Sequence, residues 1–268
     1  MSSTSALQDN DLVENPTLTD TLPVDSSAHQ QTKPLLREKY LPFLYARECP
    51  GNPNPTCDNR NCTTDFRPSL FHCDDCYSDE NLCGPCLCQG HRQNPFHRIR
   101  SWTGSATSYE TSNLTRAGFI LYLGHNGMKC PRSNPGTVSH PLHVVHVNGV
   151  HTMEVQYCSC LRGSQKQIAE EKWAQLLGHQ IFPATEARPQ TGFTFHVLKH
   201  FHQINLSSKT SAWDYSQSLI FLTDPIDPED TKSVPVSFLD ITRGKTLTPL
   251  ILRVFIHPSS WLCVNGGF

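Results

Sequence analysis

A dense series of cysteines and histidines between residues 57 and 97 is the feature that most constrains this chain. Thiolates and imidazoles are preferred zinc ligands, and a structural zinc site takes four of them in a tetrahedron. The series supplies four pairs, which makes eight such ligands: Cys57 and Cys62, Cys73 and Cys76, Cys83 and Cys86, His91 and His97. We therefore predict two zinc sites in this segment.

The spacing of the pairs indicates how they combine. Only six residues separate Cys76 from Cys83, so a site built from the second and third pairs would leave almost no chain to pack. A cross-brace, in which alternate pairs share a metal, avoids this problem. Cys49 and Cys88 are spare thiols, and either could replace an assigned ligand. We predict site 1 from Cys57, Cys62, Cys83 and Cys86, and site 2 from Cys73, Cys76, His91 and His97.

This ligand order, with histidine as the last pair, resembles the ZZ and B-box zinc fingers. A RING finger has its histidine in the middle of the order. Residues 57–100 carry five arginines and six carboxylates, and a zinc ion bound by four thiolates adds about two negative charges. An acidic module of this kind favours a basic peptide or protein as its partner over a phosphate backbone.

A disulfide framework is the alternative for twelve cysteines. Disulfide-rich domains do not need a terminal pair of histidines, and the first residues lack the basic and apolar regions of a secretory signal. The apolar run 250–256 is interrupted by Arg253 and is too short to span a bilayer. We therefore expect thiolates bound to metal in a reducing compartment.

A third, tentative site is predicted around Cys158 and Cys160. Asn148-Gly149 lies between alternating apolar and polar residues, which is a strong hairpin signal. His151 would lie about 20 Å from Cys158 along one extended strand, at about 3.3 Å per residue. His125 and Cys130 instead precede the first strand of the hairpin. An antiparallel hairpin brings the start of its first strand beside the end of its second strand, where Cys158 and Cys160 lie. We predict a site of His125, Cys130, Cys158 and Cys160; the alternative is ordinary buried thiols.

The rest of the chain divides by composition and periodicity. Residues 1–33 carry five acidic residues, one lysine and no aromatic residue, which is typical of disorder. We expect a short helix at 35–47 interrupted at Pro42, a buried strand at 118–123, and helices at 164–177, 192–206 and after Ser211. The predicted fold class is small, zinc-stabilised α+β. Its parts are an acidic tail (1–34), a helix with the cross-brace module (35–102), the hairpin and cysteine cluster (103–162), a helical region (163–224) and a divergent tail (225–268).

Residues 92–132 contain six basic residues and one carboxylate, with Phe96, Trp102 and Tyr109 interleaved among them. This is the segment that would bind a nucleic acid; the alternative, which we favour, is a solvated loop whose aromatic rings pack on the zinc module. His196 and His200 are spaced to chelate on a helix, but no third ligand accompanies them. Packing or surface roles are expected for both.

Five stretches resemble, in order and spacing, the cysteine-cluster (CxC-type) domain of the KDZ (Kyakuja–Dileera–Zisupton) transposases of fungi. They are residues 71–102, 123–131 (LGHNGMKCP), 147–160, 181–195 and 201–215 (FHQINLSSKTSAWDY). The resemblance implies a zinc-binding accessory region of a nuclear DNA transposase that binds DNA or a chromatin protein and acts in a multimer. We expect neither a membrane nor a small molecule as a partner of this chain.

Members of that family continue into an RNase H-like catalytic region, whereas this chain stops at Phe268. We therefore expect a truncated or mis-spliced product without enzyme activity. The main alternative is a ZZ- or B-box-like adaptor that binds a basic peptide or a histone tail. A metallohydrolase is disfavoured because protein ligands fill both sites of the first module, and a catalytic zinc needs an open position.

Overall fold

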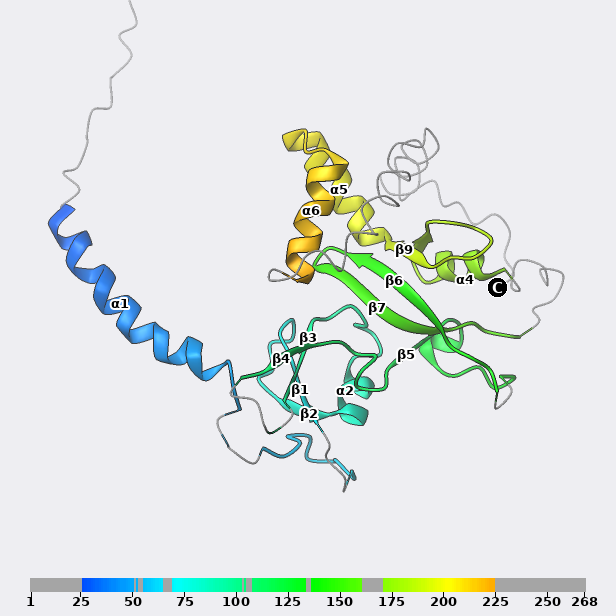
Figure 1. Ribbon diagram of the computed structural model, residues 1–268, viewed down its shortest axis with the longest axis horizontal. Helices are drawn as coiled ribbons and strands as arrows, with labels where there is room; N and C mark the ends of the chain where they lie inside the picture. The colour runs from blue at the N-terminus through cyan, green and yellow to red at the C-terminus, as the bar shows by residue number, and fades with distance from the viewer. Residues whose placement is uncertain are drawn as a thin grey trace, which may run out of the picture. The chain divides into compact units, whose positions relative to one another are not determined.

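The computed structural model describes residues 26–50, 52, 55–64, 69–102, 104, 108–133, 136–160 and 171–224 (Figure 1). The chain divides into two compact units, Met1–Arg47 and Glu48–Phe268. The predicted tail 225–268, the capping box at Ser164 and residues 1–25 of the predicted acidic tail lie outside the described residues. The α+β class predicted from the sequence is confirmed.

The first unit contains one helix, α1 (Ser26–Ala46). It begins inside the predicted disordered tail and continues through Pro42, so the predicted start at residue 35 and the interruption at Pro42 were both wrong. Proline removes one backbone donor and usually kinks a helix, which does not require the helix to end there.

The first sheet of the second unit carries the segment that is rich in cysteine. Its strands lie in the order β2-β1-β3-β4, and β1 is antiparallel to both β2 and β3. The short helix α2 (Gly84–Gly90) follows β2 directly. The strands are β1 (Leu70–Cys73), β2 (Asn81–Cys83), β3 (Ile99–Trp102) and β4 (Glu110–Ser112). This sheet therefore extends past residue 102, where the predicted division placed a boundary.

The second sheet has the order β5-β7-β6-β9-β8. Its centre is the predicted hairpin, in which β6 and β7 pair antiparallel and Val145 lies opposite Val150. Gly149 has φ +132°, a conformation that glycine adopts without steric cost. The strands are β5 (Ile120–Tyr122), β6 (His140–His146), β7 (Gly149–Gln156), β8 (Ile181–Pro183) and β9 (Thr191–Thr194). The predicted hairpin and the strand within 118–123 are confirmed.

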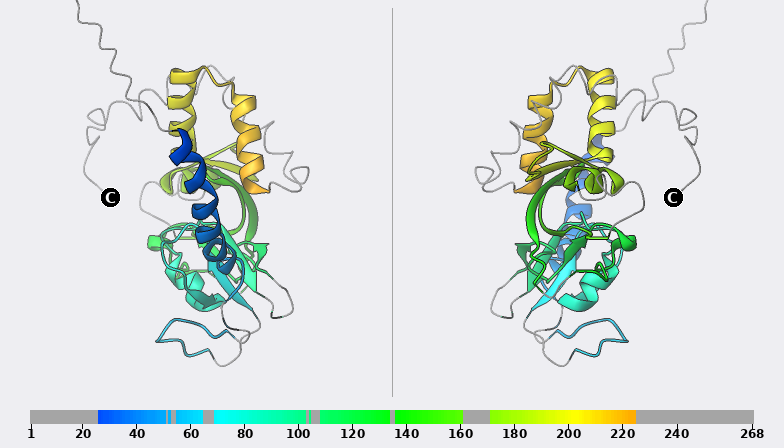
Figure 2. Two further views of the ribbon diagram at one scale, coloured as in Figure 1. Left: turned by 90° about the vertical axis from the view of Figure 1, so that its left-hand side faces the viewer. Right: turned by 90° about the vertical axis from the view of Figure 1, so that its right-hand side faces the viewer.

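Two helices follow the second sheet and join it near the hairpin turn (Figure 2). The Thr194 hydroxyl caps α5 (Phe195–Ser208) and also lies 2.9 Å from His146 Nδ1. The predicted cap of α6 (Ala212–Thr223) is confirmed, because the Ser211 hydroxyl accepts the Asp214 N–H. At the other end of α6, the Thr223 hydroxyl accepts the Val150 N–H at 2.7 Å. Both helices are therefore anchored to the hairpin.

The predicted helical region 163–224 contains β8 and β9, which the sequence did not indicate. Residues 191–194 form β9, and the helix predicted at 192–206 begins only at Phe195. The helix predicted from residue 164 is described only as α4 (Lys172–Gly178). Because β9 pairs with β6, residues 103–162 and 163–224 share one sheet and are not separate parts.

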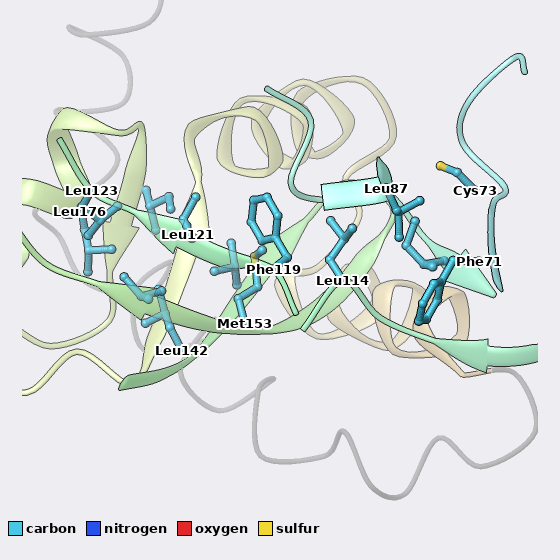
Figure 3. Close-up of a cluster of buried hydrophobic side chains, with 14 residues drawn as sticks. Phe71, Cys73, Leu87, Leu114, Phe119, Leu121, Leu123, Leu142, Met153 and Leu176 are labelled. Carbon is cyan, nitrogen blue, oxygen red and sulfur yellow. The ribbon is translucent and has the colours of Figure 1, made fainter. Parts of the chain in front are cut away.

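One hydrophobic core joins the two sheets. Phe71 and Leu87 come from the first sheet and its helix, whereas Leu121 and Met153 come from the second sheet, and all belong to the same buried cluster (Figure 3). Leu176 of α4 is fully buried at the second-sheet end of this cluster. A second cluster, around Phe193 and Val197, packs α5 and α6 against the hairpin. The cysteine-rich segment and the hairpin therefore fold as parts of one core.

Candidate metal centres

The first cluster consists of Cys57, Cys62, Cys83 and Cys86, whose sulfur atoms all lie within 4.8 Å of one another. Cys83 ends β2 and Cys86 lies in α2, so a tight strand-to-helix turn presents both thiols. The preceding loop is held against β2 because the Asn81 N–H donates to Asp58 Oδ2 at 2.7 Å. This places the first and third cysteine pairs together.

The second cluster combines Cys73, Cys76, His91 and His97. His97 Nδ1 lies 3.4 Å from each of the two sulfur atoms. His91 Nδ1 lies 2.9 Å from the Leu87 carbonyl oxygen, which only an N–H can satisfy. That bond leaves His91 Nε2, 3.5 Å from Cys76 Sγ, as the atom with a free lone pair. The pairs therefore alternate between the first two clusters along the chain.

The third cluster brings together His125, Cys130, Cys158 and Cys160. His125 Nε2 lies 3.2 Å from Cys158 Sγ and 3.4 Å from Cys160 Sγ. His125 therefore lies with the three cysteines, as the rise of an extended strand predicts. His151 lies elsewhere, with its Nε2 atom 2.8 Å from the Asn148 side-chain oxygen.

The distances between sulfur atoms within the clusters fit tetrahedral coordination of a zinc ion. Zinc–sulfur bonds of about 2.3 Å place two sulfur ligands about 3.8 Å apart. The measured separations are 3.7 Å for Cys62 and Cys83, 3.6 Å for Cys130 and Cys160, and 3.8 Å for Cys158 and Cys130. A disulfide would need about 2.05 Å, and the cysteines in the described residues are all free. The three clusters could each hold a metal ion.

Electrostatics within the clusters favours a bound cation. Backbone hydrogen bonding at Thr64 helps lower the pKa of Cys62 to about 6. Burial alone would raise the pKa of Cys130, but the backbone at Ser159 and Arg132 helps lower it to about 6. Hydrogen bonding to Cys130 in turn raises the pKa of Cys160 to about 11. Several adjacent thiolates form together only if a positive ion offsets their repulsion, which is what a zinc ion supplies.

The structure places all twelve predicted ligands in the three predicted groups. The two spare thiols belong to none of them: Cys88 Sγ lies 3.4 Å from the Ala117 carbonyl oxygen, and burial raises the pKa of Cys88 to about 11. Cys49 also lies outside the three groups. His200 Nδ1 lies 2.6 Å from the Tyr215 hydroxyl, in agreement with the packing role expected for that histidine.

Sequence reasoning missed the side chains that hold the third cluster in position. Gln175 of α4 accepts the Cys158 N–H at 2.8 Å and donates to the Cys158 carbonyl oxygen at 3.0 Å. His179 Nε2 accepts the Gly124 N–H at 2.7 Å, next to His125. Asn59 acts similarly in the first cluster, where its amide donates to Cys86 Sγ at 3.2 Å. The only sequence signal is that Gln175 and His179 are four residues apart on one face of a helix.

The fold and these clusters define a small α+β protein with three cysteine–histidine groups that could hold metal. Residues 114–227 match the family model described as a CxC2-like cysteine cluster associated with KDZ transposases. The resemblance predicted from the sequence is confirmed for this span, which contains the third cluster but not the first two. No curated protein and no solved structure matches the chain.

None of the helices in the described part of the chain combines the length and the apolar character needed to cross a bilayer.

Proposed function

We propose that this chain is a zinc-binding recognition region of a KDZ-type transposase system that acts in the nucleus and has no catalysis of its own. The observation that carries this proposal is that three ligand quartets have the spacing of tetrahedral zinc, and one of them lies within the span that matches the family. Each quartet is filled by protein ligands, as in structural zinc sites, whereas a catalytic zinc keeps a position for water. The alternating first two clusters support a ZZ- or B-box-like cross-brace.

The first test is the number of zinc ions bound per full-length chain, measured by native mass spectrometry. Three zinc ions are expected. Two ions, with the thiols of the third cluster open to alkylation, would limit the proposal to the first module. A chain that folds without zinc would contradict the proposal.

DNA is one partner proposed for this region, and the ion pairs narrow down where it would bind. Arg98 pairs with Asp75 at 3.1 Å, and Arg100 pairs with Asp74 at 2.8 Å, so these two cations are already neutralised. Lys129 and Arg132 are exposed and lie on either side of Cys130. We therefore expect phosphate contacts at this edge of the third cluster.

The double substitution Lys129→Ala and Arg132→Ala tests this DNA contact. Each lost phosphate contact should reduce the salt slope of binding by about one. The matched control is Lys199→Ala, which removes an exposed cation from α5. Equal affinities and salt slopes for the control and the double variant would contradict DNA binding at this edge.

A second candidate function is an adaptor that binds a basic peptide. The observation that favours it is the acidic character of the outer face of the first sheet. Asp74 lies beside Asp79 around a buried histidine, and Glu48 joins Asp74 in pairing with Arg100. Two of these carboxylates share the single guanidinium of Arg100, and Asp79 lies near His72 instead, so negative charge is in excess in this group, which suits a cationic partner.

A further inference from the structure

The side chain of Asn148, in the hairpin turn, reaches both loops that carry the second cluster. Its amide nitrogen donates to Asp75 Oδ2 at 3.0 Å and to the Phe96 carbonyl oxygen at 2.8 Å. These two partners lie 73 and 52 residues away along the chain. Asp75 directly precedes Cys76 of the cluster. Phe96 directly precedes His97, so one carboxamide holds the neighbours of two candidate metal ligands.

The neighbours of Asn148 define how its carboxamide is oriented. The ionised carboxylate of Asp75 and the carbonyl group of Phe96 can only accept hydrogen bonds, so the NH2 group must face them. On the opposite side, Asn148 Oδ1 lies 2.8 Å from His151 Nε2. An amide oxygen can only accept, so this imidazole nitrogen carries a proton and donates it. Three hydrogen bonds therefore use both donors and the oxygen of this side chain.

The peptide groups on both sides of His97 are held by this arrangement. The Phe96 carbonyl belongs to the peptide bond before His97 and accepts from Asn148. The Arg98 N–H belongs to the peptide bond after His97 and donates to Asp75 Oδ2 at 2.6 Å. The same carboxylate oxygen accepts from Asn148. The backbone of His97 is therefore fixed from two directions, and its Nδ1 atom lies 3.4 Å from each sulfur atom of the cluster.

The turn that carries Asn148 is itself held from the other side. The Val150 N–H donates to the Thr223 hydroxyl of α6 at 2.7 Å. The Phe96 ring also packs against the hairpin, with its centroid 5.1 Å from that of the His146 ring. Ligands are oriented best when the groups that hold them stand on rigid elements. Because the hairpin is anchored to α6, the carboxamide of Asn148 can restrain the two loops of the second cluster.

We propose that Asn148 is a positioning residue for a metal ion in the second cluster, and that metal binding there is coupled to docking of the hairpin turn against the two loops. This inference rests on the proposed metal-binding function. Contacts that orient metal ligands raise the affinity for the metal. By linkage, a bound ion must stabilise the docked hairpin to the same extent. Asn148 lies within residues 114–227, so the coupling links the family-matching span to a cluster outside it.

The test uses the full-length chain loaded with cadmium-113 in place of zinc. The NMR shift of this ion depends on the number of thiolate ligands, so the clusters with four, three and two cysteines should give separate resonances. Titration with a chelator then compares the metal affinities of the three clusters in one sample. Asn148→Ala should lower the affinity of the two-cysteine cluster by about tenfold or more. The other two affinities should stay within about twofold of their original values.

The matched control is Thr223→Val, which removes the hydroxyl that holds the same turn from the side of α6. This substitution should destabilise the turn but keep the hydrogen bonds from Asn148 to Asp75 and Phe96, so the affinity of the two-cysteine cluster should be preserved. Equal weakening of that cluster by both substitutions would overturn the inference, because any loosening of the turn would then suffice. Equal weakening of all three clusters by Asn148→Ala would overturn it as well.

A measurement on the unmodified chain tests the coupling without any substitution. Both side-chain amide protons of Asn148 are hydrogen-bonded, so they should exchange slowly with solvent in the metal-loaded chain. As the chelator removes metal, fast exchange should appear together with the loss of the resonance of the two-cysteine cluster. Slow exchange that persists after this resonance is lost would overturn the inference, even if Asn148→Ala does not fold.

Metal content distinguishes failure of this inference from failure of the proposed function. Three bound ions in the unmodified chain, with unchanged affinities in Asn148→Ala, would refute only the positioning role of Asn148. A folded chain that binds neither cadmium nor zinc would instead contradict the proposed metal-binding function.

Discussion

Replacing Gln175 with leucine should weaken metal binding at the third cluster without removing a ligand. The carboxamide makes two hydrogen bonds to the backbone of Cys158, at 2.8 and 3.0 Å. At about 0.5 to 1.5 kcal/mol each, their loss costs about 1 to 3 kcal/mol. That cost corresponds to roughly a 5- to 150-fold loss of affinity, which spans the roughly 10- to 100-fold loss typical of residues that orient metal ligands.

The assay is competition between the protein and a chromophoric chelator, with cobalt(II) as a spectroscopic substitute for zinc. Cobalt spectra depend on the number of thiolate ligands, so the cluster with three cysteines can be distinguished from those with four and two. Gln203→Leu is the control, because Gln203 is an exposed glutamine of α5. Unchanged competition in the Gln175 variant, or an equal loss in the control, would refute the reasoning.

Three further predictions concern Cys83, Gly149 and His151. Cys83→Ser should unfold the first module, because metal binding and folding are coupled; a native-like near-ultraviolet spectrum with unchanged zinc content would contradict this. Gly149→Ala should cost about 1 to 3 kcal/mol of unfolding free energy, since φ is +132° and the added Cβ would lie 2.8 Å from Thr223 Oγ1; Gly136→Ala, in open space, should be close to neutral in chemical denaturation. Burial, followed by the charge of His146, lowers the pKa of His151 from 6.5 to about 4. Between pH 6.5 and 4 the unfolded chain therefore binds a proton at His151 that the folded chain does not bind. The free energy of unfolding consequently decreases as the pH falls from 6.5 towards 4, and the contribution of His151 to stability is fully present only above pH 6.5. His151→Gln should make the loss of stability over that window shallower, as measured by denaturant titration at several pH values, and an unchanged slope would show that His151 does not contribute.

The grouping of the cysteines and histidines into three clusters was the most predictable part of this protein. Alternation of the first four pairs followed from the short chain between Cys76 and Cys83, and the choice of His125 over His151 followed from the rise of a strand. Both arguments use chain geometry, which depends little on tertiary packing. The cap at Ser211 and the turn at Gly149 were predictable for the same reason.

The errors came from elements whose stability depends on distant partners. Phe193 and Val197 share an apolar stripe at helical spacing, but Phe193 belongs to β9 because residues 191–193 pair with β6. A strand of four residues carries too little periodicity to be distinguished from the first turn of a helix. The role of Gln175 could not be predicted from the sequence either, because its partner Cys158 is 17 residues away and no motif links them.

The shared core has a practical consequence for any attempt to study the family-matching span in isolation. A fragment starting at residue 114 would keep Phe119 and Leu121 but lose Phe71 and Leu87, which belong to the same buried cluster. Its newly uncovered apolar surface would favour aggregation, whatever the state of the third cluster. Boundaries drawn from sequence similarity therefore cut through the interior of this protein, and recombinant expression should begin upstream of Cys57.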